Sequence, residues 1–72
     1  MTLNRLNTGD VAKIASIAGD EAIKARINGL GLRAGQEVAL VRRARMGGPL
    51  QIRVGHTDVL MRAEQADLIK LR

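Results

Sequence analysis

The sequence contains no cysteine, phenylalanine, tyrosine or tryptophan. Without cysteine the chain can form neither a disulfide nor a thiolate metal site, and the absence fits the reducing cytoplasm. Without aromatic side chains the core must be aliphatic. The chain also lacks the aromatic platforms on which single-stranded nucleic acids stack and the aromatic grooves that bind proline-rich peptides.

Catalytic and metal-binding groups are also scarce. Ser16 is the only serine and His56 the only histidine, and the sequence predicts them on separate segments. A nucleophile needs an adjacent base, and the base needs an orienting group. We therefore expect no enzyme activity and assign no catalytic residue. His56 with the carboxylates of Asp58, Glu64 and Asp67 is a thin set of metal ligands, so we assign no metal or cofactor site.

Long hydrophobic runs are missing as well. No apolar stretch approaches the roughly 18 residues of a membrane-spanning helix, and the N-terminus has no apolar core of signal-peptide length. We therefore expect a cytoplasmic protein without membrane insertion. The 12 lysine and arginine residues outnumber 7 acidic residues, which gives a formal net charge of +5. This excess favours an anionic partner: nucleic acid, an anionic membrane face or an acidic protein.

The chain of 72 residues is predicted to be one domain, 1–72, organised around a central hairpin. Residues 37–43 have the pattern of a strand. In residues 50–54 the apolar Leu50, Ile52 and Val54 alternate with polar residues, as in a half-buried strand. A short glycine-containing loop around Pro49 joins the two runs, which is typical of an antiparallel hairpin.

The flanking segments predict three more strands and two helical segments. Residues 11–17 form a first strand, and Asp20 caps a helix whose apolar residues Ile23, Ile27 and Leu30 form one stripe. Gly31 can end that helix in the left-handed conformation. After a turn at residues 55–58 we expect a strand with Val59 and Met61 on one face. A single helical turn at 63–67 and a closing strand at 68–71 complete the chain. Short strands at this spacing favour a small closed barrel, whose closure would remove exposed edges.

The order of these features resembles the FeoA family, ferrous iron transport protein A, over nearly the whole chain. The resemblance rests on the following residues in their order and spacing: Leu6, Gly9, Ile14, Ile27, Leu30, Gly31, Leu32, Gly35, Val38, Gly48, Pro49, Leu50, Ile52, Val54, Met61, Arg62, Ala66 and Ile69. It implies a five-stranded SH3-like barrel with one α-helix in its N-terminal half and a short C-terminal helical turn. It also implies a cytoplasmic accessory protein that binds FeoB, the membrane iron permease with a GTP-binding domain, and regulates it or helps it assemble.

The hairpin tip is the predicted partner-binding surface. Alternation along the strand would place Arg43 and Arg45 on one face, beside the apolar loop residues Met46 and Pro49. Leu32 is a further candidate at the opposite end of the barrel. These apolar residues could instead close the ends of the barrel, which is the favoured interpretation for Leu32 and stays open for Met46. The alternative function is a basic barrel that binds nucleic acid or is related to repressor domains, because Arg42, Arg43, Arg45 and Arg53 concentrate positive charge around the hairpin.

Overall fold

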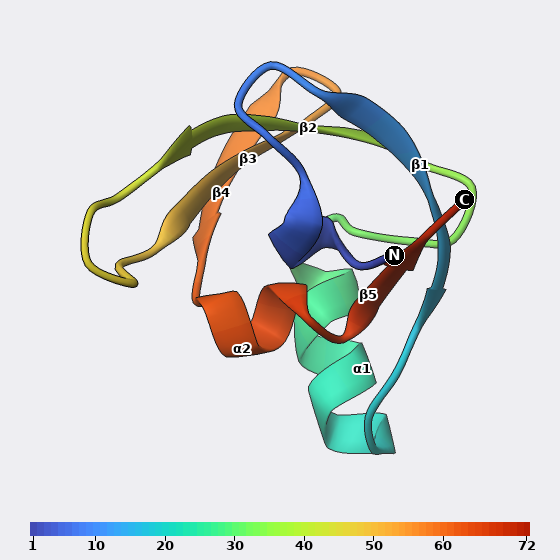
Figure 1. The fold of residues 1–72 in the computed structure, drawn as a ribbon. Helices are drawn as coiled ribbons and strands as arrows, with labels where there is room; N and C mark the ends of the chain where they lie inside the picture. Colours follow the sequence, from blue (N-terminus) through green and yellow to red (C-terminus); the bar gives the residue numbers. More distant parts are fainter.

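Five antiparallel strands form one sheet in the order β4-β3-β2-β1-β5 (Figure 1), in a computed structural model that describes all of residues 1–72. The strands are β1 (Val11–Ile17), β2 (Glu37–Arg43), β3 (Leu50–Val54), β4 (Thr57–Met61) and β5 (Ile69–Leu71). The helical segments are the 3-10 helix η1 (Leu3–Arg5), α1 (Glu21–Gly29) and the single turn α2 (Ala63–Ala66). The predicted mainly β architecture, with one early helix and a short C-terminal helical turn, is confirmed.

Strand β1 changes partner along its length, and this change curls the sheet. Residues Val11 to Lys13 pair with β2, whereas residues from Ile14 to Ile17 pair with β5 across a register irregularity. The sheet therefore bends around its inner face, and β5 lies far from β3 and β4 across the interior (Figure 1). Strand register fixes which face of each strand is buried.

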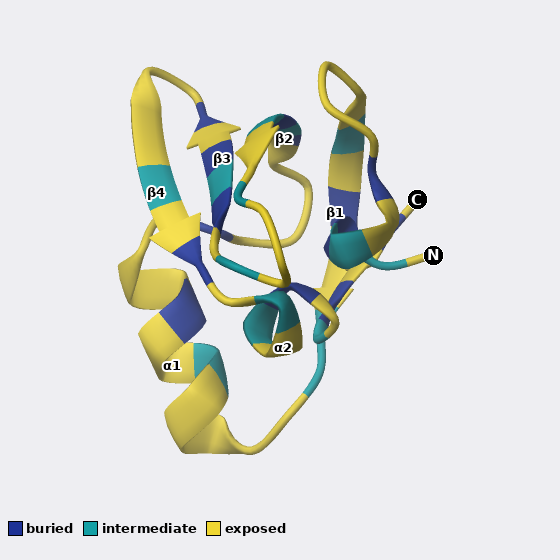
Figure 2. Ribbon diagram, turned by 60° about the vertical axis from the view of Figure 1, so that its left-hand side comes forward, coloured by how far each residue is buried: buried dark blue, intermediate teal, exposed yellow.

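The core is entirely aliphatic, as expected for a chain without aromatic residues. It contains Leu3, Leu6, Ile14, Ile27, Leu32, Val38, Leu40, Leu50, Ile52, Val54, Met61, Ala66, Ile69 and Leu71, and no polar or charged residue is buried. Figure 2 shows these positions alternating with exposed ones along the strands. Leu3 begins the 3-10 helix η1 and Leu6 follows it, and both side chains are buried. The sequence predicts neither this helix nor the burial of Leu3 and Leu6.

Helix α1 begins and ends where the sequence predicts. The Asp20 carboxylate accepts a hydrogen bond of 2.9 Å from the Ile23 amide. At the other end the amides of Gly31 and Leu32 donate to the carbonyls of Asn28 and Ile27, the paired bonds of a Schellman motif. The predicted apolar stripe is only partly buried, however. Ile27 is fully buried, while Ile23 and Leu30 remain more than one-third exposed, because only one side of the helix meets the barrel.

The sheet has two edges, and only one of them is covered. At β5 the N-terminal segment lies alongside: Thr2 pairs with Lys70, and the Leu71 amide donates to the Met1 carbonyl at 2.8 Å. No strand pairs with the outer side of β4. The prediction that barrel closure would remove the edges is therefore wrong for β4, because α2 separates β4 from β5 along the chain and the two strands do not pair.

The predicted turn at residues 55–58 is shorter in the structure. Thr57 already pairs with Val54 and Asp58 with Arg53, so both belong to β4 and the turn consists of Gly55 and His56 alone. Alternation then continues as predicted. Met61 is buried and Val59 half-buried, while Leu60 is exposed on the outer face.

No helix of this chain is both long enough and apolar enough to cross a membrane.

Candidate docking surface

A bulge in β2 decides which arginines face solvent at the central hairpin. Leu40 pairs with Ile52, but the next paired residue is Arg42, which lies opposite Gln51. Val41 is therefore the extra residue of the bulge. Because residues directly opposite each other share a face of the sheet, Arg42 points outward with Gln51. The position after it falls on the inner side.

Arg43 is that inner-side residue, and its guanidinium binds the N-terminal segment. It lies opposite the buried Leu50. Its Nη1 donates to the side-chain oxygen of Asn4 at 2.8 Å, and its Nη2 donates to the carbonyls of Asn4 at 2.7 Å and Leu6 at 3.2 Å. The prediction that strand alternation places Arg43 and Arg45 on one face is wrong, because the bulge turns Arg43 to the inner side and β2 ends at Arg43, before Arg45. Arg43 holds the N-terminal segment against the barrel.

The hairpin tip, residues 44–49, presents a methionine in an uncommon backbone conformation. The Gly48 amide donates to the Arg45 carbonyl at 3.1 Å, and both residues between them have positive φ, +57° at Met46 and +74° at Gly47. This is the pattern of a type I′ turn, which favours asparagine or glycine at both central positions. A methyl group on Gly48 would lie 2.8 Å from the Cβ of Ala44, so the tip closes tightly there. The Met46 side chain is fully exposed, at 102% of its reference area.

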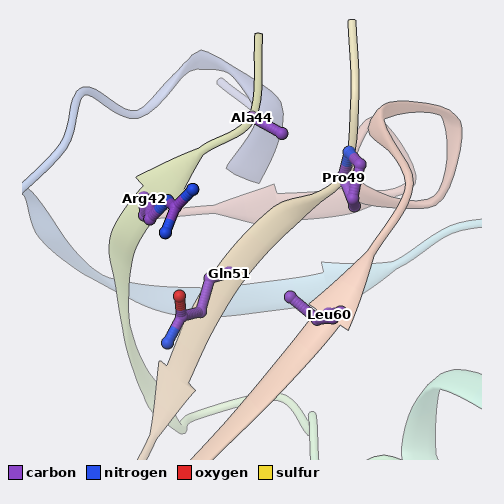
Figure 3. Close-up of a pocket in the computed structure, with 5 residues that line it drawn as sticks. All are labelled: Arg42, Ala44, Pro49, Gln51 and Leu60. Carbon is purple, nitrogen blue, oxygen red and sulfur yellow. The ribbon is translucent and has the colours of Figure 1, made fainter.

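A shallow hollow of about 210 Å³ lies beside this tip, on the outer face of β2, β3 and β4. Its walls are Arg42, Ala44, Pro49, Gln51 and Leu60, contributed by the three strands and the two ends of the tip (Figure 3). Leu60 is 69% exposed on the outermost of these strands. We call this site the outer hollow. Of its residues, Pro49 belongs to the predicted partner-binding surface. Arg42, Gln51 and Leu60 were not predicted to be part of that surface.

An ion pair lies next to the outer hollow along the same face. Arg53 donates to Asp58 through Nε at 2.8 Å and through Nη2 at 3.0 Å, and Gln51 donates to the same carboxylate at 2.9 Å. The hydrogen bonds from Arg53 and Gln51 lower the pKa of Asp58, and the bond to Asp58 raises the pKa of Arg53. This is the only salt bridge of the molecule. The Asp58 carboxylate thus accepts hydrogen bonds from Arg53 and Gln51 of β3 and none from His56.

The structure brings no catalytic or metal-binding constellation together. Ser16 lies on β1, where it pairs with Lys70, and His56 lies in the distant turn between β3 and β4. Nowhere do three histidine, cysteine, aspartate or glutamate side chains gather closely enough to hold a metal ion.

The predicted partner-binding residues therefore separate into two groups. Arg45, Met46 and Pro49 lie exposed at the hairpin tip. Arg43 is engaged by the N-terminal segment, and Leu32 is completely buried where it packs after the last turn of α1. Leu32 has no surface to offer a partner, so we remove it from the candidate surface. Leu60 could have been found from the sequence, because alternation with Val59 and Met61 already placed a large apolar side chain on the outer face.

Comparisons with known proteins give a single family. The FeoA domain model matches residues 1–72. The solution structure of FeoA from Chlorobium tepidum is 31% identical, with a TM-score of 0.89 over 99% of this chain and 68% of that chain. The crystal structure of Stenotrophomonas maltophilia FeoA complexed with zinc, described as an SH3 domain protein, is 30% identical. It has a TM-score of 0.85 and covers 100% of this chain and 89% of that one. No curated protein matches the sequence.

The fold also occurs in proteins of another kind. A manganese-dependent transcriptional repressor superimposes with a TM-score of 0.86 over 96% of this chain and 39% of that chain. Its sequence is only 17% identical, so the likeness concerns the fold alone.

Proposed function

Because this chain belongs to the FeoA family, we propose that it is a non-enzymatic, cytoplasmic accessory protein of ferrous iron uptake that binds a FeoB-type GTP-binding transporter through the hairpin tip. The family consists of ferrous iron transport accessory proteins with an SH3-like fold. Its Stenotrophomonas maltophilia member is described as a candidate activating factor of bacterial ferrous iron transport. A transporter as partner fits that description.

The observation that carries this proposal is the conformation and exposure of Met46. A left-handed backbone costs a residue with a side chain roughly 1–2 kcal/mol. Packing of the Met46 side chain within the domain does not offset this cost, because that side chain is fully exposed. Strained, exposed residues cluster at binding sites, and methionine adapts well to the surface of a partner. We therefore assign Met46 the central contact.

The surroundings of Met46 suit an interface close to a membrane. Arg45 and Pro49 are exposed on either side of the turn, so an apolar centre lies beside positive charge. Such a centre with a charged rim is the usual anatomy of a protein interface. Anionic lipids make the cytoplasmic membrane face negative, which attracts basic segments by about 1 kcal/mol per residue near the surface. Charge would then raise the encounter rate, while Met46 sets the lifetime of the complex.

Nucleic-acid binding is the weaker candidate. Of the four arginines that suggested it, Arg43 binds the N-terminal segment and Arg53 is paired with Asp58. Arg42 and Arg45 remain free of such bonds, but they lie on the outer face and in the loop. The structure therefore offers no continuous row of free arginines at the hairpin.

The test uses a substitution that should move stability and binding in opposite directions. Asparagine tolerates the left-handed conformation, so Met46→Asn should raise the free energy of unfolding by roughly 0.5–1 kcal/mol. The same change should weaken capture of the detergent-solubilised transporter by at least about fivefold, as expected for a central contact. Urea denaturation and a pull-down measure the two effects. Arg45→Glu should lower capture mainly at low salt, because it acts on encounter.

Val11→Thr is the matched control, since Val11 is also an exposed apolar residue, 57% exposed, but lies on β1 away from the tip. It should leave capture unchanged. If Met46→Asn and Arg45→Glu both retain wild-type capture at low and moderate salt, the tip is not the interface.

A further inference from the structure

The outer edge of β4 has unused main-chain hydrogen-bonding capacity along the whole strand. No hydrogen bond from a turn, loop or cap reaches the main chain of residues 55–61. The opposite edge, β5, is covered by the N-terminal segment through Thr2 and Met1. In Figure 2, β4 lies at the margin of the molecule, with β3 on its inner side. Soluble proteins normally protect such an edge, because it can pair with another strand.

The hairpin geometry shows which groups point outward from this edge. A two-residue turn at Gly55 and His56 makes Val54 and Thr57 a hydrogen-bonded pair. Bonded and non-bonded pairs alternate along an antiparallel ladder, so the next non-bonded residues of β4 are Asp58 and Leu60. Their N–H and C=O groups therefore point away from β3, towards the open edge.

None of the usual protective devices is present on β4. The strand has no proline and no lysine, and its five pairs with β3 continue without a bulge. Its one charged side chain, Asp58, is turned towards Arg53 and Gln51 on β3. Leu60, 69% exposed, forms the near wall of the outer hollow. An added strand would find both free main-chain groups and an apolar contact.

The charge around this edge selects an acidic occupant. Arg42 and Arg53 lie on the outer face and Arg62 follows directly after β4, so three arginines outnumber the carboxylates of Asp58, which pairs with Arg53, and of Glu64, which lines a hollow with Arg62. A second copy of this chain would bring its own net charge of +5 to the same place. Like charges brought together oppose association. An acidic segment, in contrast, is attracted to these arginines.

We propose that the β4 edge binds an extended acidic segment of a partner protein by strand addition. The main chain of this segment exchanges hydrogen bonds with Asp58 and Leu60, and one of its apolar side chains packs on Leu60. Its carboxylates are attracted to the surrounding arginines. Main-chain bonds supply affinity in this mode of recognition, and alternate side chains supply specificity. The surface differs from the hairpin tip, so this inference does not depend on the transporter proposal.

The first experiment titrates the isotope-labelled full chain with a ten-residue peptide that alternates glutamate with valine and isoleucine. We expect the amide signals of Asp58 and Leu60 to shift and their hydrogen exchange to slow. A peptide with lysine in place of glutamate should not bind. Arg62→Gln should weaken binding about three- to fivefold, the range of an exposed ion pair. Arg33→Gln, which removes the same charge elsewhere on the surface, should leave binding unchanged.

The second experiment removes the main-chain donor. Proline is tolerated on an edge strand where its nitrogen faces solvent, so Leu60→Pro should fold and weaken binding at least about tenfold. Leu60→Thr keeps the amide and should weaken binding only about threefold, through the lost apolar contact. Should Leu60→Pro fail to fold, a glutamate peptide N-methylated at alternate residues tests the same bonds on the wild-type chain, and we expect it not to bind.

Four results would overturn the proposal. The first three are peptide binding unaffected by Leu60→Pro or by N-methylation, signal changes confined to other elements, and no binding at millimolar peptide. Concentration-dependent shifts of Asp58 and Leu60 without peptide would make a second copy the occupant, against the proposal. The peptide experiment contains no transporter, so its failure leaves the hairpin-tip proposal standing, and the converse also holds.

Discussion

At the scale of single residues, neighbouring arginines of β2 have opposite roles. The bulge at Val41 directs Arg42 outward beside Gln51 and turns Arg43 to the inner side of the sheet. Arg42 then lines the outer hollow, whereas Arg43 makes three hydrogen bonds to the segment that covers the β5 edge. The bulge therefore decides which of the two arginines lies at the surface and which holds the N-terminal segment.

The two arginines should differ in a mutational comparison. Arg43→Ala removes the bonds to Asn4 and Leu6, so we expect the free energy of unfolding to fall by about 1–2 kcal/mol. Arg42→Ala should change it by less than about 0.5 kcal/mol. Urea denaturation measures both. Equal effects would mean that the N-terminal segment is not held by Arg43.

Asp58 gives a second prediction at this scale, concerning pH. Its pKa in the folded protein lies below the ordinary value of 3.8, because Arg53 and Gln51 donate to the carboxylate. A group with a depressed folded pKa stabilises the protein above its unfolded pKa, and this stabilisation is lost as the pH falls through the folded pKa. The stability difference between wild type and Asp58→Asn should therefore be constant near neutral pH and shrink below about pH 4.

Urea denaturation of both proteins across that pH range checks this expectation. Added salt should reduce the difference at neutral pH, because the pair is exposed and screened. A difference that grew as the pH fell would contradict the assignment of a lowered pKa to Asp58.

At the scale of the elements, α1 has well-formed hydrogen bonds at both ends but buries little of its apolar face. Its first turn is capped by the Asp20 side chain, and its last turn is closed by the Schellman bonds at Gly31. Only Ile27 of its apolar residues is fully buried. A helix of nine residues is marginal alone, so it depends on these terminal bonds and on the packing of Ile27 against the barrel.

The helix cap can be tested directly. Asp20→Ala removes the acceptor for the Ile23 amide and should lower the free energy of unfolding by about 1 kcal/mol. Asp20→Asn keeps an acceptor at the same place and should cost only a few tenths. Denaturation midpoints of the two variants give the comparison. An unchanged midpoint in Asp20→Ala would show that the cap does not stabilise the helix.

At the scale of the whole molecule, a small aliphatic core supports all of these surfaces. The core draws on every strand, on α1 and α2, and on the N-terminal segment. A domain of this size buries a modest share of its surface, so its stability has little reserve. One deletion in the core should therefore affect the hairpin tip and the β4 edge together.

Ile52 is the test position, because it is fully buried in β3 between β2 and β4. Ile52→Ala should lower the free energy of unfolding by about 2–5 kcal/mol, the usual cost of a large-to-small change in a core. Gln51→Ala on the opposite face loses one hydrogen bond, to Asp58, and should cost only about 0.5–1 kcal/mol. Thermal or urea denaturation compares the two. Similar costs at both positions would contradict the assignment of Ile52 to the buried face of β3 and of Gln51 to the exposed face.

The sequence by itself determined the elements, because their signals are local. The alternation of Leu50, Ile52 and Val54 specifies the inner face of β3, and the capping carboxylate of Asp20 specifies the start of α1. The five strands, the helix and the C-terminal helical turn follow from such patterns. Each of these depends on interactions within a few residues of the chain.

Only the tertiary structure decided the site and the edges, because these depend on pairing between distant segments. The bulge that turns Arg42 outward and Arg43 inward exists only in the register of β2 against β3. Leu3 and Leu6 become core residues because the N-terminal segment lies against β5. Leu60 joins the outer hollow because three strands bring it near Pro49. The composition of single segments carries no information on such pairings, since register is fixed by what each strand finds opposite itself.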